Sequence, residues 1–420
     1  MVKLDETYTE EEQERIDAVN RYQKSERPSK ICKSLGRSRS WLQKWVGRYN
    51  SLNKSREKEW FKEQSRAPKN VHRKTDSEIE QLVVNVRKSL LEGATEDTKY
   101  RCIGAVEIEF RMHELGYSED ETPSLSTIKR IIKRNGLIVQ KRKRYIRCKS
   151  KKRYTLLNPT KANDVHQMDF VGPRHIKGYG RISSLNLIDV VSSKAHIQQY
   201  AGQTMDNVIE FLLECWTKNT IPNYLQMDNG ASFIGDLIHS RHFSRVVRLC
   251  LHLGVEPVFI APSKPWMNGR IEDFNGDFGE KLWEREQWTD LEHIRSEAKT
   301  FLMRHNNRQD WKYRKTDLEA IPHRKLPENF EIGVDSLPIT EGKVHFIRQV
   351  KGDGTISVLN EDFDVGESMA YEYVWATIDT KQEQLKVYYR EKNAEEAGLI
   401  KIHEYRIGEN VKIFEEKFRT

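Results

Sequence analysis

Three acidic residues in the middle of the chain stand where they could act together. Asp169 lies within the apolar run 165–171 and Asp228 closes another short apolar run, so both are expected on strands. Glu272 follows Asn268, which can cap a helix by accepting a hydrogen bond from its first turn, and Glu272 then falls just inside that helix. Because an acid inside an apolar strand is costly unless it is solvated, paired or bound to metal, Asp169 is the strongest candidate.

Three carboxylates that converge from two strands and a helix suit metal-dependent cleavage of a phosphodiester. That reaction needs an activated oxygen nucleophile and relief of charge on the leaving oxygen, and two divalent ions roughly 3.5–4 Å apart provide both. Hard cations such as Mg²⁺ prefer carboxylate oxygens. We therefore expect two Mg²⁺ ions, for which Mn²⁺ is a possible substitute, with Asp169 bridging both and Asp228 and Glu272 each binding one.

The acids also have structural explanations. Asp228 precedes Asn-Gly and could be only a turn residue, because Asp and Asn favour such bends. Glu272 could be only a favourable charge near a helix N-terminus. Two other acids compete as ligands, Asp189 on the second expected strand and Asp273, which points about 100° away from Glu272 around a helix.

The acid motifs carry a resemblance to a known family. Gln167-Met-Asp-Phe170, Asp228-Asn-Gly230 and Pro265-Trp-Met-Asn-Gly-Arg-Ile-Glu272, in this order, resemble the retroviral-integrase superfamily of DDE transposases. Within it, the sequence is similar to insertion-sequence transposases with an integrase catalytic core, over roughly residues 154–327. The 43 residues between Asp228 and Glu272 exceed the family's best-known spacing, and the polar segment 235–242 can house the surplus.

The resemblance implies a ribonuclease-H-like core and a DNA transposition activity. In such proteins, water frees a 3′-hydroxyl at each terminal inverted repeat of the transposon, and that hydroxyl then attacks target DNA. The partners would be double-stranded DNA, of the transposon ends and of the target, and further copies of this chain, because a dimer or higher homo-oligomer must hold two ends together. Retroviral integrases also carry an N-terminal His/His/Cys/Cys zinc module, which this sequence lacks.

Two other functions stay open. The first is a domesticated, non-catalytic DNA-binding regulator that retains the core, although retention of all three acids argues against decay. The second is a nuclease of the same fold that cuts RNA–DNA hybrids and joins nothing. Tyrosine and serine recombination are disfavoured, because neither needs three acids in this arrangement.

Composition favours a nucleic-acid partner in a reducing compartment. The 420 residues predict about three or more domains. The formal net charge is +8, and residues 129–153 hold thirteen Lys or Arg and no acid, which favours binding to a polyanion, although a solvated linker is the plainer explanation. Five scattered cysteines argue against a disulfide framework. A leader and a long apolar run are both missing, so we expect a cytoplasmic, nucleoid-associated prokaryotic protein that does not enter a membrane.

Two helix-turn-helix domains are expected before the core, over residues 1–66 and 67–137. Each ends in a helix whose outer face is basic and polar, although a plain three-helix bundle would show the same pattern. The DNA-contact candidates of the first domain are Arg37, Arg39, Ser40, Gln43 and Lys44, and those of the second are Ser126, Thr127, Arg130 and Lys133.

Further phosphate contacts are expected outside these domains. The basic linker 138–154 contributes Lys141, Arg142, Lys143 and Arg144. Lys264 and Arg270 flank the acid-bearing helix and would suit the phosphates of a DNA end, with solvated charges as the alternative. Trp266 could stack on a base or simply pack its loop.

The predicted fold class is multidomain α+β. The core, residues 155–330, has three strands followed by alternating helices and strands, which is the order of the ribonuclease-H-like α/β fold that the resemblance implies. Short strand-like runs with turn residues between them predict a small β-barrel over residues 331–420. Such a barrel could hold DNA or serve only a structural or oligomerising role.

Overall fold

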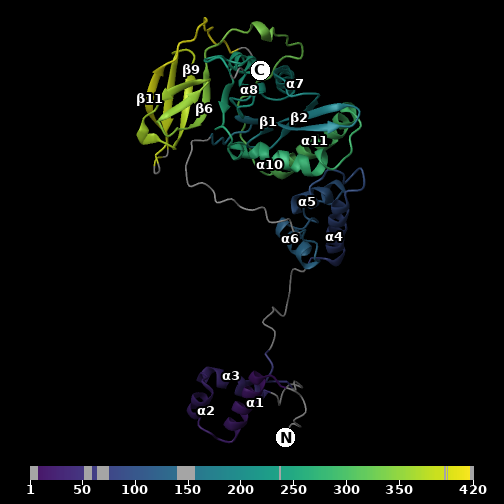
Figure 1. Ribbon diagram of the computed structural model, residues 1–420. Coiled ribbons are helices and arrows are strands. Elements are labelled where there is room, and N and C mark those ends of the chain that lie inside the picture. Colours follow the sequence, from purple (N-terminus) through teal and green to yellow (C-terminus); the bar gives the residue numbers. More distant parts are fainter. Residues whose placement is uncertain are drawn as a thin grey trace. The chain divides into compact units, whose positions relative to one another are not determined.

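The computed structural model describes residues 8–51, 59–63, 75–139, 157–235, 238–391, 394 and 396–416. The chain divides into two compact units, Met1–Lys74 and Thr75–Thr420 (Figure 1). The predicted contact residues Lys141, Arg142, Lys143 and Arg144 lie outside the described residues.

The first unit is a three-helix domain whose local sequence signals set the helix ends. Its helices are α1 (Glu10–Gln23), α2 (Pro28–Leu35) and α3 (Arg39–Asn50). Gly36 ends α2 in the left-handed conformation that glycine favours, and the Ser38 side chain accepts a hydrogen bond from the first turn of α3. The apolar sides of the helices bury a small core of Ala18, Val19, Ile31, Cys32, Leu42, Trp45 and Val46. These helices agree with those predicted for the first helix-turn-helix domain.

The second unit begins with another three helices, α4 (Ser77–Glu92), α5 (Ala105–Glu114) and α6 (Leu125–Arg134). They enclose an apolar core of their own, to which Val83 of α4, Ile108 of α5 and Ile128 of α6 contribute. Side chains of α5 also contact the long helix α11 (Leu291–Tyr313), which lies later in the same unit, where the Phe110 and Trp311 rings stack with centroids 5.5 Å apart. This helical segment is therefore fixed to the part of the chain that follows it.

A nine-stranded mixed sheet forms the centre of the second unit, in the order β11-β10-β9-β6-β5-β4-β1-β2-β3. The first five strands of the sequence are β1 (Val165–Ile176), β2 (Gly180–Asp189), β3 (Ala195–Tyr200), β4 (Tyr224–Met227) and β5 (Glu256–Phe259). Strands β1 to β3 form an antiparallel meander, and β4 and β5 join β1 in parallel. The predicted ribonuclease-H-like order of elements agrees with this core.

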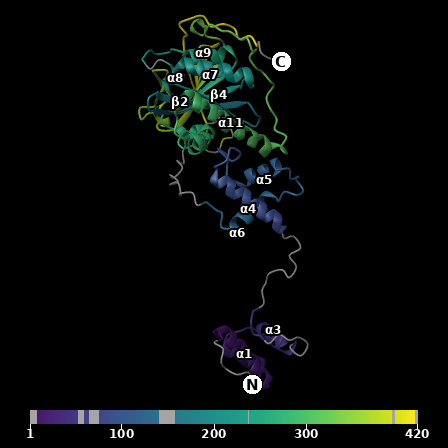
Figure 2. The same ribbon diagram turned by 90° about the vertical axis from the view of Figure 1, so that its right-hand side faces the viewer.

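Helices cover both faces of this sheet, because successive residues of a strand point to opposite sides. The helices are α7 (Met205–Lys218), the short α8 (Ala231–Ile234), α9 (Arg245–His252), α10 (Gly269–Phe278) and α11. Leu185 and Leu187 of β2 share a core with α7 and α9, whereas Ile182 and Ile188 of the same strand share one with α10 and α11. Figures 1 and 2 show α7 and α8 on one side of the strands and α11 on the other.

The predicted small β-barrel is not confirmed. The strands after the core are β6 (Lys343–Gln349), β7 (Thr355–Val358), β8 (Glu361–Asp364), β9 (Tyr373–Asp379), β10 (Gln384–Tyr389) and β11 (Gly398–Glu404). Strand β6 pairs in parallel with β5, and β9, β10 and β11 extend the same sheet, while β7 and β8 form a separate hairpin. This pairing covers the backbone groups that β5 would otherwise leave unpaired at an edge. Strands β6, β9, β10 and β11 therefore continue the sheet of the core.

Among the described residues, no helix combines the length and the apolar character that crossing a membrane requires.

Candidate active site

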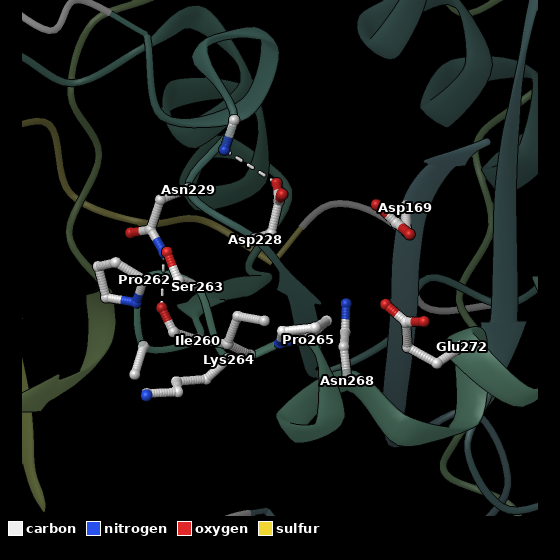
Figure 3. Close-up of a pocket in the computed structure, with 12 residues that line it drawn as sticks. Asp169, Asp228, Asn229, Ile260, Pro262, Ser263, Lys264, Pro265, Asn268 and Glu272 are labelled. Atoms are coloured by element: carbon white, nitrogen blue, oxygen red, sulfur yellow. Dashed lines mark hydrogen bonds between the residues drawn. The ribbon is translucent and has the colours of Figure 1, made fainter. Parts of the chain in front are cut away.

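The three predicted acids line one pocket of about 300 Å³ (Figure 3). Asp169 lies within β1, Asp228 directly follows β4, and Glu272 lies in the first turn of α10. Gln167 of β1 pairs with Gln226 of β4 in parallel register, so the two aspartates, each two residues later, emerge side by side. The sheet and the helix thus bring together residues that are far apart in the sequence.

The remaining walls come from the turn after β4 and the loop before α10. They consist of Asn229, Gly230, Ile260, Ala261, Pro262, Ser263, Lys264, Pro265 and Asn268. In Figure 3 the carboxylates of Asp169 and Glu272 lie on the same side of the pocket, and Asp228 lies across from them.

Burial and mutual repulsion perturb these acids. Burial, followed by the charges of Asp228 and Glu272, raises the pKa of Asp169 to about 7. Burial also raises the pKa of Glu272, with contributions from the neighbouring charges of Asp273 and Asp228. Carboxylates that repel one another in a common pocket are stabilised in the charged form by a bound cation.

Hydrogen bonds orient two of the carboxylates. The Asn275 side chain donates to Oδ2 of Asp169 over 3.1 Å, and the backbone N–H of Gly230 donates to Oδ1 of Asp228 over 2.8 Å. Asn275 in turn accepts from Nδ2 of Asn186, which lies directly opposite Asp169 on β2. Asn275 thus holds Asp169 from outside the pocket, and Gly230, which belongs to the pocket wall, holds Asp228.

The support of Asp169 continues across two strands. The Gln199 side chain donates to Oγ of Ser184 over 3.0 Å, and Ser184 donates to Oδ1 of Asn186 over 2.7 Å. All three side chains are buried. This chain of hydrogen bonds was not predicted from the sequence, although Ser184 and Asn186 are polar residues beside the apolar Leu185 and Leu187 and could have signalled it.

Arg348 of β6 supports the turn that follows Asp228 and was also missed. Its guanidinium donates to Oδ1 of Asn229 over 2.8 Å and to the carbonyl of Ile260 over 3.3 Å. Burial lowers the pKa of Arg348 to about 10. The sequence offered one signal for this role: Arg348 is a charged residue that directly follows the apolar Phe346 and Ile347 in an expected strand.

The expected role of Asn268 as a side-chain cap is wrong. Asn268 does stand at the N-terminus of α10, but its side chain makes no capping hydrogen bond. Instead, Oε1 of Gln167 accepts the backbone N–H groups of Arg270 and Ile271, while Oδ1 of Asn268 accepts from Gln226. A strand residue therefore caps the acid-bearing helix.

The donor set fits hard divalent cations. The pocket offers carboxylate oxygens from three side chains, two of which have raised pKa values. Over the part of the chain that the structure describes, no three His, Cys, Asp or Glu side chains are arranged around a single ion. The three carboxylates nevertheless line one pocket, where burial and neighbouring negative charges favour a bound cation.

The competing acids do not line this pocket. Asp189 lies at the end of β2, where its carboxylate accepts from the backbone N–H groups of Asn163 and Ser192. Asp273 is exposed next to Glu272 and is not part of the pocket wall.

The two predicted phosphate contacts near the acids lie in different settings. Lys264 is half-buried in the pocket wall, with Nζ 5.1 Å from the centroid of the exposed Trp266 ring. Arg270 is exposed in the first turn of α10 and does not line the pocket.

The predicted DNA-contact residues of both helical domains lie on the outside of their last helices. On α3 and just before it, Arg37, Arg39, Ser40, Gln43 and Lys44 are exposed. Two of them form ion pairs, Arg37 with Glu14 at 2.7 Å and Lys44 with Glu63 at 3.0 Å. On α6, Ser126, Arg130 and Lys133 are exposed and Thr127 is half-buried.

Comparisons with known proteins identify two of these regions. Residues 159–265 and 253–309 each match a family described as integrase core domain, and residues 9–55 match a homeodomain-like domain. The predicted resemblance is confirmed for these segments. No curated protein sequence matches the chain.

Similar solved structures include the magnesium complex of the HTLV-2 integrase catalytic core domain in two forms. The dimeric form is 16% identical, with 37% of this chain and 89% of that chain covered and a TM-score of 0.24. The trimeric form is also 16% identical, with 39% and 90% covered and a TM-score of 0.24.

Proposed function

We propose that this chain, in which a homeodomain-like domain is followed in the sequence by an integrase core domain, is a DNA transposase. It would bind the terminal inverted repeats of a transposon, cleave at the 3′ ends and join them to target DNA. The observation that supports this most is that Asp169, Asp228 and Glu272 line one pocket. The protein would act as a dimer or higher homo-oligomer on DNA, because two ends must be held together.

The three acids would hold the metal. When bound, two Mg²⁺ ions would supply an activated attacking oxygen and relief of charge on the leaving oxygen. Asp169 would contribute to both ions, and Asp228 and Glu272 to one each. Asn275 and the N–H of Gly230 keep the Asp169 and Asp228 carboxylates in orientation. The two reactions need no covalent intermediate with the protein, since water and the freed 3′-hydroxyl are the nucleophiles.

DNA binding would be divided among several surfaces. The exposed faces of α3 and α6 would read the transposon end, because one helix-turn-helix unit contacts only a few base pairs. Lys264 would contact a phosphate beside the acids, and Arg270 another at the start of α10. Lys141, Arg142, Lys143 and Arg144 would add sequence-independent affinity.

The decisive experiment replaces Asp228 with Asn. A labelled DNA end, chosen from inverted repeats that flank the coding region, is incubated with the full chain and Mg²⁺. We expect the variant to lose end cleavage and strand transfer while it still binds the end, because the amide keeps the shape but not the charge of a ligand. Strand transfer at the wild-type rate would defeat the assignment.

The same assay separates the alternatives. A domesticated DNA-binding regulator would bind the end and leave it intact in Mg²⁺ or Mn²⁺. A nuclease for RNA–DNA hybrids would cut a hybrid but never form the joined product with target DNA.

A further inference from the structure

Two glutamines occupy matching positions before the two aspartates. Gln167 precedes Asp169 by two residues and Gln226 precedes Asp228 by two, so Gln-Met-Asp occurs twice in the chain. The two glutamines are direct partners in the parallel pairing of β1 with β4. Their side chains are 6% and 2% exposed, so each amide must find its hydrogen-bond partners inside the protein.

Gln167 caps the helix that carries Glu272. Its Oε1 accepts the backbone N–H of Arg270 over 3.0 Å and that of Ile271 over 3.1 Å. The first N–H groups of a helix have no partner within the helix, so an acceptor from outside stabilises its start. Here the acceptor belongs to the same strand as Asp169.

Gln226 binds the segment just before that helix through its other amide atom. Its Nε2 donates to the carbonyl of Met267 over 2.8 Å and to Oδ1 of Asn268 over 3.1 Å. Nδ2 of Asn268 lies 3.5 Å from the carbonyl of Met168, which ties the same turn back to β1. Asn268 is 2% exposed, so this contact is also interior.

At paired positions of β1 and β4, one glutamine therefore accepts hydrogen bonds and the other donates them. Gln167 uses its oxygen toward the N–H groups of α10, whereas Gln226 uses its nitrogen toward the acceptors of the preceding turn. An apolar side chain of the same length could fill either space but could make neither set of hydrogen bonds. The requirement is thus for these particular amides, beyond the packing that any buried side chain supplies.

We propose that Gln167 and Gln226 are positioning residues that lock the start of α10 against β1 and β4, and so set the place of Glu272 relative to Asp169 and Asp228. The link to metal binding rests on the proposed function. Glu272 follows the second capped N–H group by one residue, so a shift in the cap moves its carboxylate directly. Partners that orient metal ligands are worth about 10–100-fold in metal affinity in other proteins.

The opposite polarity allows a matched test in the full-length protein. Glu substituted at position 167 keeps an acceptor for the two N–H groups, whereas Glu at position 226 has no donor and places oxygen against two acceptors. Both variants add the same charge at paired positions of neighbouring strands. We expect Gln226→Glu to raise the Mg²⁺ concentration for half-maximal strand transfer by about tenfold or more, and Gln167→Glu to raise it much less.

A readout without metal tests the cap itself. In Gln167→Met, which fills the space without an acceptor, we expect the amide hydrogens of Arg270 and Ile271 to exchange about tenfold faster than in the wild type. In Gln167→Glu they should stay protected. Thermal unfolding of each variant shows whether the protein is folded, and Gln226→Met replaces Gln226→Glu if the charged variant is not.

Each outcome decides a separate point. Unchanged exchange at Arg270 and Ile271 in Gln167→Met would overturn the cap. The positioning role would be overturned if Gln167→Met exchanged these amide hydrogens faster but reached half-maximal strand transfer at the wild-type Mg²⁺ concentration. It would also be overturned if Gln167→Glu and Gln226→Glu needed the same Mg²⁺ concentration for half-maximal strand transfer. A wild-type protein that shows no Mg²⁺-dependent reaction on DNA ends would defeat the proposed function, while the exchange measurement would still decide whether Gln167 caps α10.

Discussion

The two helical domains share a plan but differ in what surrounds them. Both have three helices, a small apolar core and an outward basic last helix, α3 in one and α6 in the other. The first forms a compact unit of its own, whereas the second belongs to the same unit as the catalytic core. The difference shows that a similar three-helix arrangement can form either a separate unit or an integral part of a larger one.

Charge pairs explain why the second domain is held to the core. Buried Glu107 of α5 binds Arg101 of its own domain at 2.9 Å and Arg308 of α11 at 3.3 Å. Lys99 binds Glu297 of α11 at 2.7 Å. Arg304 of α11 donates to two backbone carbonyls of the helical segment, those of Lys99 and Glu96. Under the proposed function, α6 would therefore read DNA at a set distance from the acids.

The largest effect is expected from breaking this attachment. Glu107→Ala takes away the buried carboxylate that Arg101 and Arg308 share, while Arg101 keeps its pair with Glu114 at 2.9 Å. It should cost about 3 kcal/mol of unfolding free energy, the lower end for breaking a buried pair, because burial also raises the pKa of Glu107. The matched change in the first domain is Glu14→Ala, which removes a partly exposed pair with Arg37 and should cost about 0–1 kcal/mol. Denaturant unfolding of the full chain measures both. Equal losses of unfolding free energy in the two variants would show that the ion pairs of Glu107 stabilise the chain no more than the pair of Glu14 does.

A smaller, pH-dependent effect is expected at the pocket that the three acids line. The ordinary pKa of Asp169 is 3.8 and the folded value is about 7, so its contribution to stability is present below pH 3.8 and is lost as the pH rises to about 7. Asp169→Asn avoids this loss. In metal-free buffer at pH 8, the free energy of unfolding of the variant should exceed that of the wild type by on the order of 1–3 kcal/mol. This difference should grow between pH 4 and pH 7.

Calorimetry of the same variant sharpens the comparison between the units. Only the transition of the unit that contains Asp169 should move, and the transition of the first domain should stay in place. Mg²⁺ at pH 8 should stabilise the wild type more than Asp169→Asn. A gain that is independent of pH would contradict the raised pKa of Asp169, which is caused by burial and by the charges of Asp228 and Glu272.

The smallest effects are expected from the outward basic residues. Arg39→Ala with Lys44→Ala on α3, and Arg130→Ala with Lys133→Ala on α6, should each reduce the salt dependence of end binding, by about one unit of slope for every phosphate that the variant no longer neutralises. Because α6 is held to the core, its double variant should stay impaired in strand transfer at saturating protein. The α3 double variant should regain wild-type strand transfer at saturating protein. Recovery of both would contradict a fixed position for α6.

Local signals allowed most helices and the acids to be predicted from the sequence. Pro28, Gly36 and Ser38 mark helix ends through interactions within a few residues, and the structure places them accordingly. Asp169, Asp228 and Glu272 were identified because each stands in a motif, and the structure places all three around one pocket. Their catalytic role stays a prediction.

Non-local contacts explain what the sequence did not reveal. The cap of α10 comes from Gln167, about a hundred residues earlier, so Asn268 seemed the obvious candidate. The pairing of β6 with β5 cannot be told from a closed barrel when only short strands and turns are visible. The ion pair between Glu107 of α5 and Arg308 of α11 could not be predicted, because no local signal in the sequence links these two helices.

The place of β6 determines which fragments of this protein could be produced alone. A fragment that ends with the integrase-core match, at residue 309, would lack β6 and would leave the backbone edge of β5 unpaired. It would also lose Arg348, which supports the turn beside Asp228. Such a truncated protein should aggregate through the exposed strand. For this chain, a minimal fragment that contains the three acids therefore has to run through β11, the last strand at this end of the sheet.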